Sequence, residues 1–341
     1  MTYRPPTPGL NDPFTLTFSE SSSGDLQGVR FSHSNFTSGV AAIRALFPPS
    51  IALSTLDTIV STHSLSTPFG RAIAYTALYE CACFATCDST RIYYNSNVES
   101  SGSSRNVDDL LSATKLPIPS PTVLFVHPDH LQDLSAAMLS RAKSSFLYPI
   151  VWRHKVAALA EGFLSKESLW DRAVFDGARE HVLGRMASTL KATVVGGGEC
   201  FSDTLVLAPM WFPGSLPNDA LTPARVALSV PLIRTYVHPL ICGPMLATHA
   251  FDLQSLPSAE GEQAHVGAPS VNVEIKLVGI DDAAVERGVD PKGGLLVRGP
   301  PVGMPVSVAS NTEATEQDWL QTGVIARVMT NGTFKVVETK S

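Results

Sequence analysis

The chain has 341 residues, a formal net charge of -6 and charged side chains at 16% of its positions. With a sequence pI of 5.8, it offers no basic face for a phosphate backbone, so we expect no nucleic-acid partner. The hydrophobic content of 44% is enough to bury one large core or several subdomains. No apolar stretch approaches the roughly 20 residues that a membrane-spanning helix requires. The composition therefore predicts a folded globular chain without a transmembrane segment.

The five cysteines are an odd number in a chain that shows no secretory leader, which favours a reducing compartment. We expect a cytoplasmic protein, because the last residues are not the Ser-Lys-Leu peroxisomal signal. Peripheral membrane or peroxisomal association is the alternative. Cys81, Cys83 and Cys87 crowd into an apolar, small-residue run without the spacing or histidine partners of a zinc site. They are expected to be buried core thiols, and no metal site is predicted.

The first elements read as strand, loop, helix and strand. Residues 1–13 are rich in proline and polar residues and predict an irregular arm, after which Phe14–Phe18 alternates like a strand. A serine- and glycine-rich loop follows. Phe36–Phe47 has helical spacing, and Asp57–Val60 is typical of a short buried strand.

The middle of the chain continues this alternation. Thr122–Val126 predicts a strand, with Asp129 expected to cap a helix that begins at His130. A long helical region is expected over Tyr148–Leu183, and Ala192–Val195 predicts a strand that runs into three glycines. Strands that alternate with helices through about residue 248 indicate an α/β layer built on a largely parallel sheet with flanking helices.

Beyond residue 265 the pattern becomes β-rich. Four segments predict strands separated by Gly, Pro and Asp turns, namely Val271–Val278, Leu295–Arg298, Val324–Met329 and Thr333–Val337. These segments predict a smaller barrel-like or sandwich subdomain after the α/β layer.

The segment from Phe18 to Val29, with Ser32–Asn35 after it, has the spacing of a phosphate loop. It resembles the aromatic-T-S-G-T-T-G-x-P-K-G-V and T-H-x-N motifs of AMP-forming acyl-CoA synthetases, an adenylating-enzyme superfamily. Backbone N–H groups and hydroxyls of such a loop can wrap a triphosphate. The resemblance implies this role for Ser19, Ser22, Ser23 and Gly24. Gln27 stands where the family has its phosphate-binding lysine. The alternative reading of the loop is a plain polar turn.

Two further stretches resemble the long-chain fatty-acid subtype of that family. Leu169–Arg179 is similar to its W-D-x-L-V-F-x-K-V-R motif, while Ser66–Arg71 stands at its P-L-A-H-x-F-G-R motif with Thr67 replacing the histidine. The glycines that follow the predicted strand resemble its adenine-side S-G-G-A-P loop, which implies nucleotide-site positions for Gly196, Gly197 and Gly198. Three glycines also suit any tight exit from a strand.

The magnesium motif Q-G-Y-G-L-T-E of the family falls on residues 242–248. By that resemblance Pro244 replaces the adenine-stacking ring, Ala247 replaces the phosphate-binding threonine and Thr248 replaces the glutamate that positions Mg²⁺. None of the three side chains can perform the family role, so the resemblance implies a nucleotide site without its metal ligand.

The β-rich part carries the remaining matches. His265–Pro269 resembles H-V-G-x-P, and Trp319–Ile325 resembles W-L-x-T-G-D-I except that Val324 replaces the aspartate that holds the ribose hydroxyls. Phe334–Lys340 resembles the hinge strand L-K-I-I-D-R-K, with Thr339 in place of the arginine. An apolar side chain at the ribose position would leave the hydroxyls unpaired.

The resemblance implies an incomplete version of the family's N-terminal domain. We expect an arm at 1–13, a remnant of the first α/β subdomain with a degraded phosphate loop at 14–66, a second α/β subdomain at 67–249 and a β-rich subdomain at 250–341 that ends at the hinge. The family's small C-terminal lid domain is expected to be absent. A sheet built from the remainder would expose an edge, which predicts a protein partner to cover it.

Three functional hypotheses remain. The first is a long-chain acyl-CoA synthetase-like ligase impaired in ATP-dependent fatty-acid activation; the second is a non-catalytic module that binds an acyl group or a protein; the third is a truncated product without independent function. We assign no catalytic residue and no cofactor, with ATP and Mg²⁺ required only if family activity remains. Long-chain acyl groups or CoA-pathway small molecules are the expected ligands. Asp171 and Glu199 are interpreted as cap or solvated carboxylates.

Overall fold

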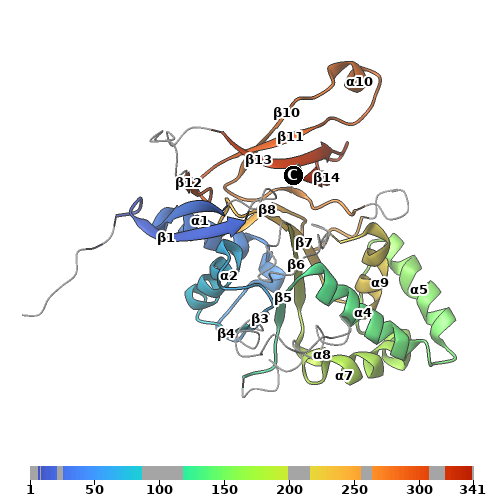
Figure 1. The fold of residues 1–341 in the computed structure, drawn as a ribbon. Coiled ribbons are helices and arrows are strands. Elements are labelled where there is room, and N and C mark those ends of the chain that lie inside the picture. The colour runs from blue at the N-terminus through green and yellow to red at the C-terminus, as the bar shows by residue number, and fades with distance from the viewer. Residues whose placement is uncertain are drawn as a thin grey trace, which may run out of the picture.

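A central sheet with helices on both faces organises the chain in the computed structural model, and a smaller antiparallel sheet lies above it (Figure 1). The structure describes residues 7, 9–20, 26–86, 118–198, 216–254, 263–306 and 319–339. The predicted α/β class with a largely parallel sheet is confirmed.

The central sheet has seven strands in the order β4-β3-β5-β6-β7-β8-β9. The first five are mutually parallel, whereas β8 and β9 run antiparallel to their neighbours. Their bounds are β3 Thr58–Ser61, β4 Cys83–Thr86, β5 Val123–Val126, β6 Ala192–Gly198, β7 Leu232–Val237, β8 Pro244–Ala247 and β9 Ala268–Pro269.

The inner strands β3, β5 and β7 are buried on both faces, as parallel strands covered by helices usually are, whereas the edge strand β4 and the short β9 are more exposed. Alternate residues enter two separate cores: Val60 and Leu124 join one cluster, while their chain neighbours Ile59 and Val123 join the other. A continuous apolar run such as residues 123–126 follows from this double burial, because neither face of the strand meets solvent.

Helices α1 His33–Ala45 and α2 Pro68–Tyr79 cover one face, with the short turn η1 Pro49–Ile51 between α1 and β3. The helices of the other face are α4 Pro128–Ala142, α5 Tyr148–Ala160, α6 Leu169–Asp171, the π-helical turn η3 Arg172–Asp176, α7 Gly177–Leu183, α8 Met186–Thr189 and α9 Asn218–Leu228. Figure 1 shows α1 and α2 on one side of the sheet, and α4, α5 and α9 on the other.

Two antiparallel sheets complete the described fold. A four-stranded sheet has the order β10-β11-β13-β14, with β10 Glu274–Val278, β11 Lys292–Arg298, β13 Leu320–Val328 and β14 Phe334–Thr339. A short helix, α10 Asp282–Glu286, connects β10 to β11. The sheet is open within the described residues rather than closed into a barrel. A three-stranded sheet has the order β1-β2-β12, with β1 Pro13–Glu20, β2 Leu26–Ser32 and β12 Met304–Val306.

Three local predictions need correction. Helix α4 begins at Pro128 with His127 at the N-cap, because proline is favoured at the first helical position. Asp129 therefore lies within the first turn and is not the N-cap residue. The three glycines do not leave the sheet: Gly196–Gly198 extend β6 and pair with Thr235–Val237. Cys81 and Cys83 are exposed rather than buried, because they lie at the turn into the edge strand β4; Cys87 lies outside the described residues.

No helix in the described ranges is both long and apolar enough to cross a lipid bilayer.

The N-cap of α2 yields a stability prediction. The Thr67 hydroxyl accepts a hydrogen bond from the Gly70 backbone N–H at 3.0 Å. Thr67→Ala leaves that donor unpaired and should lower the free energy of unfolding by about 1 kcal/mol, whereas Thr67→Ser should retain most of it. Urea denaturation of the two variants and the parent checks this, and equal losses for Ala and Ser would contradict the capping role.

Candidate functional site

The carboxyl ends of the parallel strands are where open α/β sheets bind ligands. In this chain three histidines follow those ends: His63 follows β3, His127 follows β5 and His238 follows β7. The backbone N–H of His127 donates to the Thr62 hydroxyl at 3.1 Å, which joins the segments after β3 and β5. The sheet therefore presents imidazole groups at the edge where ligand chemistry is expected.

The His63 ring is the most enclosed of these groups. Its side chain packs between Phe69 and His127, with ring centroids 4.9 Å and 4.1 Å away. A Cβ atom on Gly196 would lie 2.7 Å from His63 Nε2, so only glycine lets β6 approach the ring. Burial holds the pKa of His63 well below its ordinary value of 6.5, and the neighbouring histidines add to the effect. A neutral imidazole thus lies against the first of the three predicted adenine-side glycines.

His127 and His130 were not predicted to be site residues. Both lie next to His63 at the start of α4, with the ring centroids of His127 and His130 5.9 Å apart. The available signal was position, since His63 and His127 each follow a buried strand by one or two residues. Among the described residues, no group of three or more His, Cys, Asp or Glu side chains is arranged to hold a metal ion.

Several predicted nucleotide-site positions meet at the end of β7. Gly198 lies opposite Val237 in the sheet, and Val237 lies opposite Pro244 on its other side. His238 Nε2 contacts the Thr322 backbone carbonyl at 3.1 Å, which connects β7 to the start of β13. The central sheet and the four-stranded sheet therefore meet beside the glycine strand.

Val324 and Thr339 also come together. They are opposite residues in the β13–β14 ladder, although one was predicted at the ribose position and the other at the hinge. The Val324 side chain is fully buried in a cluster with Val297 and Phe334. The position thus contributes to the apolar core beneath the four-stranded sheet.

Thr248 is buried just beyond β8, which ends at Ala247 opposite Thr235. Its hydroxyl accepts a hydrogen bond from the Arg234 backbone N–H at 2.9 Å, and its own N–H donates to the Arg234 carbonyl at 2.9 Å. The Arg234 guanidinium is buried beside His265, donating to its carbonyl at 2.7 Å. Thr248 therefore acts as a backbone partner next to a buried cation.

Ser19 and Gln27 face each other across the β1–β2 hairpin. The Ser19 hydroxyl is buried and donates to the Gln27 carbonyl at 3.4 Å, whereas the Gln27 side chain is exposed. Within the described chain, no hydrogen bond or strand pairing joins these two residues to Gly198, Pro244 or Val324. The predicted loop residues Ser22, Ser23 and Gly24 lie outside the described residues.

The Asp171 prediction needs correction. This carboxylate is fully buried, and it forms ion pairs with both Lys155 and Arg179. Lys155 Nζ also donates to the Ser229 hydroxyl at 2.6 Å, and Arg179 Nε donates to the Ala227 carbonyl at 2.9 Å. The carboxylate is thus the centre of a buried network that joins α5, α6, α7 and the end of α9. Glu199 lies outside the described residues.

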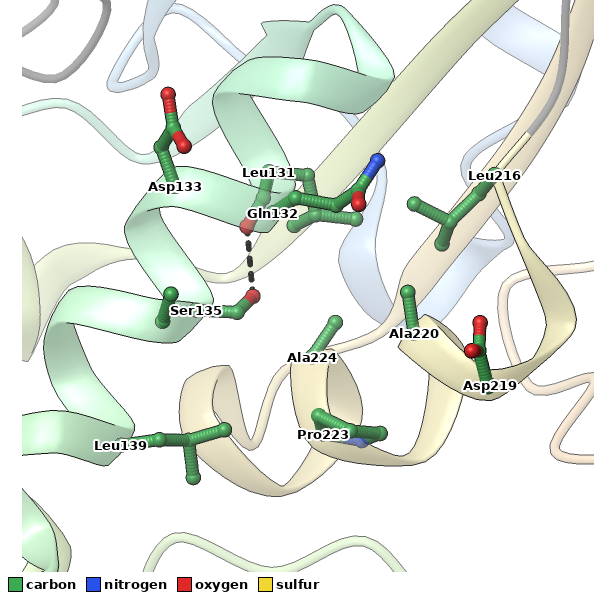
Figure 2. A pocket seen from close by; sticks show the side chains of 11 residues that line it. Leu131, Gln132, Asp133, Ser135, Leu139, Leu216, Asp219, Ala220, Pro223 and Ala224 are labelled. Atoms are coloured by element: carbon green, nitrogen blue, oxygen red, sulfur yellow. Dashed lines mark hydrogen bonds between the residues drawn. The ribbon is translucent and has the colours of Figure 1, made fainter. Parts of the chain in front are cut away.

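A separate open cavity of about 440 Å³ lies between α4 and α9 (Figure 2). Leu131 and Leu139 from α4 and Leu216 before α9 form its apolar wall, and Gln132 from α4 and Asp219 from α9 also line it. None of the predicted nucleotide-site residues lines it.

Comparison with known proteins gives a consistent but distant relationship. No protein-family model matches the chain. Human long-chain-fatty-acid–CoA ligase 1 is 25% identical over 343 residues, which covers 99% of this chain and 42% of the ligase. Mouse long-chain-fatty-acid–CoA ligase 5 is 23% identical over 345 residues, covering 99% of this chain and 43% of that protein. The chain therefore spans about two-fifths of the length of these curated relatives.

Solved structures agree on the fold. A ternary product complex of malonyl-CoA ligase with methylmalonyl-CoA and AMP superposes with a TM-score of 0.58 at 14% identity, covering 98% of this chain and 55% of the other. The inhibitor-bound N-terminal domain of FACL13 from Mycobacterium tuberculosis gives a TM-score of 0.57 at 10% identity, covering 98% and 63%. At such identities the likeness shows the fold, which matches an adenylating-enzyme N-terminal domain.

The buried network predicts a large cost for neutralising its centre. Asp171→Asn leaves Lys155 and Arg179 without their buried counter-ion and should lower the free energy of unfolding by about 3–5 kcal/mol. Asp176→Asn is the matched control, because Asp176 pairs with the same arginine but has 45% of its side chain exposed. That variant should lose no more than about 1 kcal/mol. Similar urea midpoints for the two variants would contradict a structural role for the Asp171 network.

The buried histidines predict acid sensitivity. Burial lowers the pKa of His238 and of His265 to about 4, below the ordinary value of 6.5. The unfolded chain therefore binds protons first, so stability present at neutral pH is lost as pH falls from about 6.5 towards 4. Each such histidine contributes a slope of up to about 1.4 kcal/mol per pH unit. Urea titrations across this range should show a shallower slope for His238→Gln, and an unchanged slope would contradict the assignment.

Proposed function

We propose that this chain, a distant homologue of part of the long-chain fatty-acid–CoA ligases, is impaired in ATP-dependent fatty-acid activation. Those ligases belong to the AMP-forming adenylating-enzyme superfamily. The homology and the fold supply the premise. The impairment is argued from the side chains at the positions that would have to bind ATP and Mg²⁺.

The observation that carries the proposal is the burial of Val324. An aspartate at this position would need to reach the ribose hydroxyls, but Val324 is fully buried against Val297 and Phe334. A valine offers no hydrogen bond, and a ribose placed there would lose its water partners without replacement. An unpaired buried polar group costs about 1–3 kcal/mol, which opposes nucleotide binding.

The metal position supports the same conclusion. Mg²⁺ prefers oxygen ligands in octahedral geometry and usually takes at least one carboxylate. Thr248 supplies none, and its hydroxyl already accepts the Arg234 N–H. The Arg234 side chain is a buried cation that pairs with the Asp252 carboxylate at 3.3 Å. The residues present therefore do not fit a magnesium ion, and no catalytic step is assigned to one.

The phosphate position lacks its cation as well. Gln27 is neutral and exposed on β2, whereas a lysine would form charge-assisted hydrogen bonds to phosphate. The difference is about 1.5–3 kcal/mol for such a contact. Loss of the ribose, metal and phosphate contacts together removes most of the charge stabilisation that acyl-adenylate formation requires.

A non-catalytic binding module is the second candidate. The preserved scaffold favours it: both faces of the central sheet retain continuous apolar cores around α1 and α2 and around α4, α7 and α9. The neutral His63 ring against Gly196 also fills the space beside the predicted adenine-side strand with protein. Such a chain keeps the means to fold and bind while lacking nucleotide chemistry.

Exchange of labelled pyrophosphate into ATP, in the presence of a long-chain fatty acid, tests the proposal. We expect a rate at least about 1,000-fold below that of an active long-chain ligase measured in parallel, because two or more interactions of about 2–4 kcal/mol each are missing. Exchange within tenfold of the active ligase would overturn the proposal.

Restoring the cation gives a finer prediction. Gln27→Lys should tighten ATP binding by about tenfold or more, in line with the estimate for a charge-assisted contact. Gln27→Met is the matched control, since it has a similar volume and no charge and should leave the affinity unchanged. Calorimetric titration of ATP into the three proteins provides the measurement. Equal affinities for Lys and Met variants would show that position 27 does not face the triphosphate.

A further inference from the structure

Helix α5 presents one face to the core and the other to solvent. Val151, Lys155 and Leu159 recur at every fourth position and are buried. Residues two positions away from such a stripe lie on the opposite side of a helix, and Arg153 and Ala157 there are exposed. Figure 1 shows α5 as the outermost helix on its side of the sheet. Lys155 belongs to the buried ion-pair network, so the direction of the outer face is fixed.

Large apolar side chains are exposed on and around α5. Ile150 lies in the first turn of the helix and is 56% exposed, and Phe146, four residues earlier, is 88% exposed. Trp170 approaches the helix from α6, with its ring centroid 6.4 Å from that of His154. Exposed apolar side chains that gather in this way mark an interaction site. The apolar set of α5 is defined here as Phe146, Ile150, Phe163, Leu169 and Trp170.

Cations outnumber carboxylates in the segment that carries the apolar set. Its exposed charged side chains, over residues 140–172, are four cations and two carboxylates, namely Arg141, Lys143, Arg153, Arg172, Glu161 and Glu167. Lys166 is half-buried and donates to the Ala187 and Leu190 carbonyls. The whole chain has a formal net charge of -6, so this segment is positive within an acidic protein. A partner that fits it combines apolar material with negative charge.

We propose that the outer face of α5 docks on the surface of an anionic lipid bilayer, with the helix parallel to the membrane plane. The apolar set enters the boundary between headgroups and acyl chains, while Lys143 and Arg153 meet the lipid phosphates. Helices that lie in this boundary bind through buried apolar area together with attraction to anionic lipids. Tryptophan and long basic side chains suit the headgroup level, because each has an apolar body and a polar tip.

Shape and charge favour a bilayer over a second copy of this chain. Phe146 and Leu169 are 88% and 82% exposed, so these side chains protrude, and none of the apolar set lines the cavity between α4 and α9. A fluid bilayer accepts protruding side chains without a matching shape. Arg153 lies in the middle turn of α5, so two copies docked about a twofold axis at this face would bring their guanidinium groups together.

Co-sedimentation of the purified chain with lipid vesicles tests the proposal. We expect binding to vesicles made of equal parts phosphatidylserine and phosphatidylcholine, and binding at least about tenfold weaker to phosphatidylcholine alone, because each cation at the surface contributes about fivefold. Added salt should weaken the binding, since it screens that attraction.

Phe146→Ser combined with Ile150→Ser should weaken binding to the anionic vesicles at least about tenfold, because two apolar side chains no longer leave water. Leu56→Ser combined with Leu78→Ser is the matched control. Leu56 and Leu78 are 88% and 70% exposed, but Leu78 belongs to α2 on the opposite face of the sheet. The control should bind as the parent does.

A charge pair tests the electrostatic part. Lys143→Gln combined with Arg153→Gln should lower the preference for anionic over neutral vesicles about tenfold or more. Arg287→Gln combined with Lys292→Gln removes the same charge from exposed positions on the β10–β11 connection and strand β11, and should leave the preference unchanged.

Quenching of tryptophan emission by brominated lipids reports the orientation. The chain has four tryptophans, and Trp170→Phe should remove most of the quenching, whereas Trp319→Phe should not. Failure to bind anionic vesicles would overturn the proposal, as would equal binding to both vesicle types or equal losses in the test and control variants. Self-association that depends on Phe146 in place of vesicle binding would also overturn it. The test requires no nucleotide and no fatty acid, so its outcome is independent of the proposed function.

Discussion

A single buried carboxylate organises the helical layer that supports the sheet. Asp171 is held by Lys155 from α5 and by Arg179 from α7, and both cations extend to the end of α9 through Ser229 and Ala227. Burial lowers the pKa of Lys155, and the attraction of Asp171 opposes that shift. A charge of either sign left alone here would be costly, so the positions of four helices are coupled.

This coupling matters for the sheet because the same helices cover one of its faces. Val174 and Phe175, on the π-helical turn between Asp171 and Arg179, are buried in the core that also holds Leu124 and Val195. With that layer fixed, the carboxyl ends of β3, β5, β6 and β7 are held in register. The edge of the sheet at which open α/β folds bind ligands is therefore intact.

The fold was more predictable than the site, for physical reasons. A short continuous apolar run such as residues 123–126 is typical of a strand buried on both faces, and motifs spread along the chain carried the family resemblance. The sequence did not reveal that Asp171 would be buried, because a carboxylate before a helical segment looks like a cap until its two cations are brought to it by the fold. The predicted burial of Cys81 and Cys83 was wrong for a similar reason. The apolar run leads into a turn and an edge strand, which exposes both thiols.

The site positions were predicted by matching segments to family motifs, because the side chains of no single segment indicated the site. Gly196–Gly198 read as a loop because glycine is rare in strands, yet the close approach of His63 requires glycine at Gly196 inside β6. His63, His127 and His238 are far apart in sequence, and only the parallel sheet brings the segments that carry them to one edge. Local patterns could not report that convergence.

We propose that a scaffold of the adenylating type has exchanged its nucleotide contacts for packing and backbone contacts, as at Val324 and Thr248. Calorimetric titration of the whole chain with ATP in the presence and absence of Mg²⁺, at matched ionic strength, tests it most directly. We expect no magnesium-dependent gain in ATP affinity, because Thr248 stands in place of a carboxylate at the proposed metal position. Saturable ATP binding that tightens tenfold or more with Mg²⁺ would contradict it.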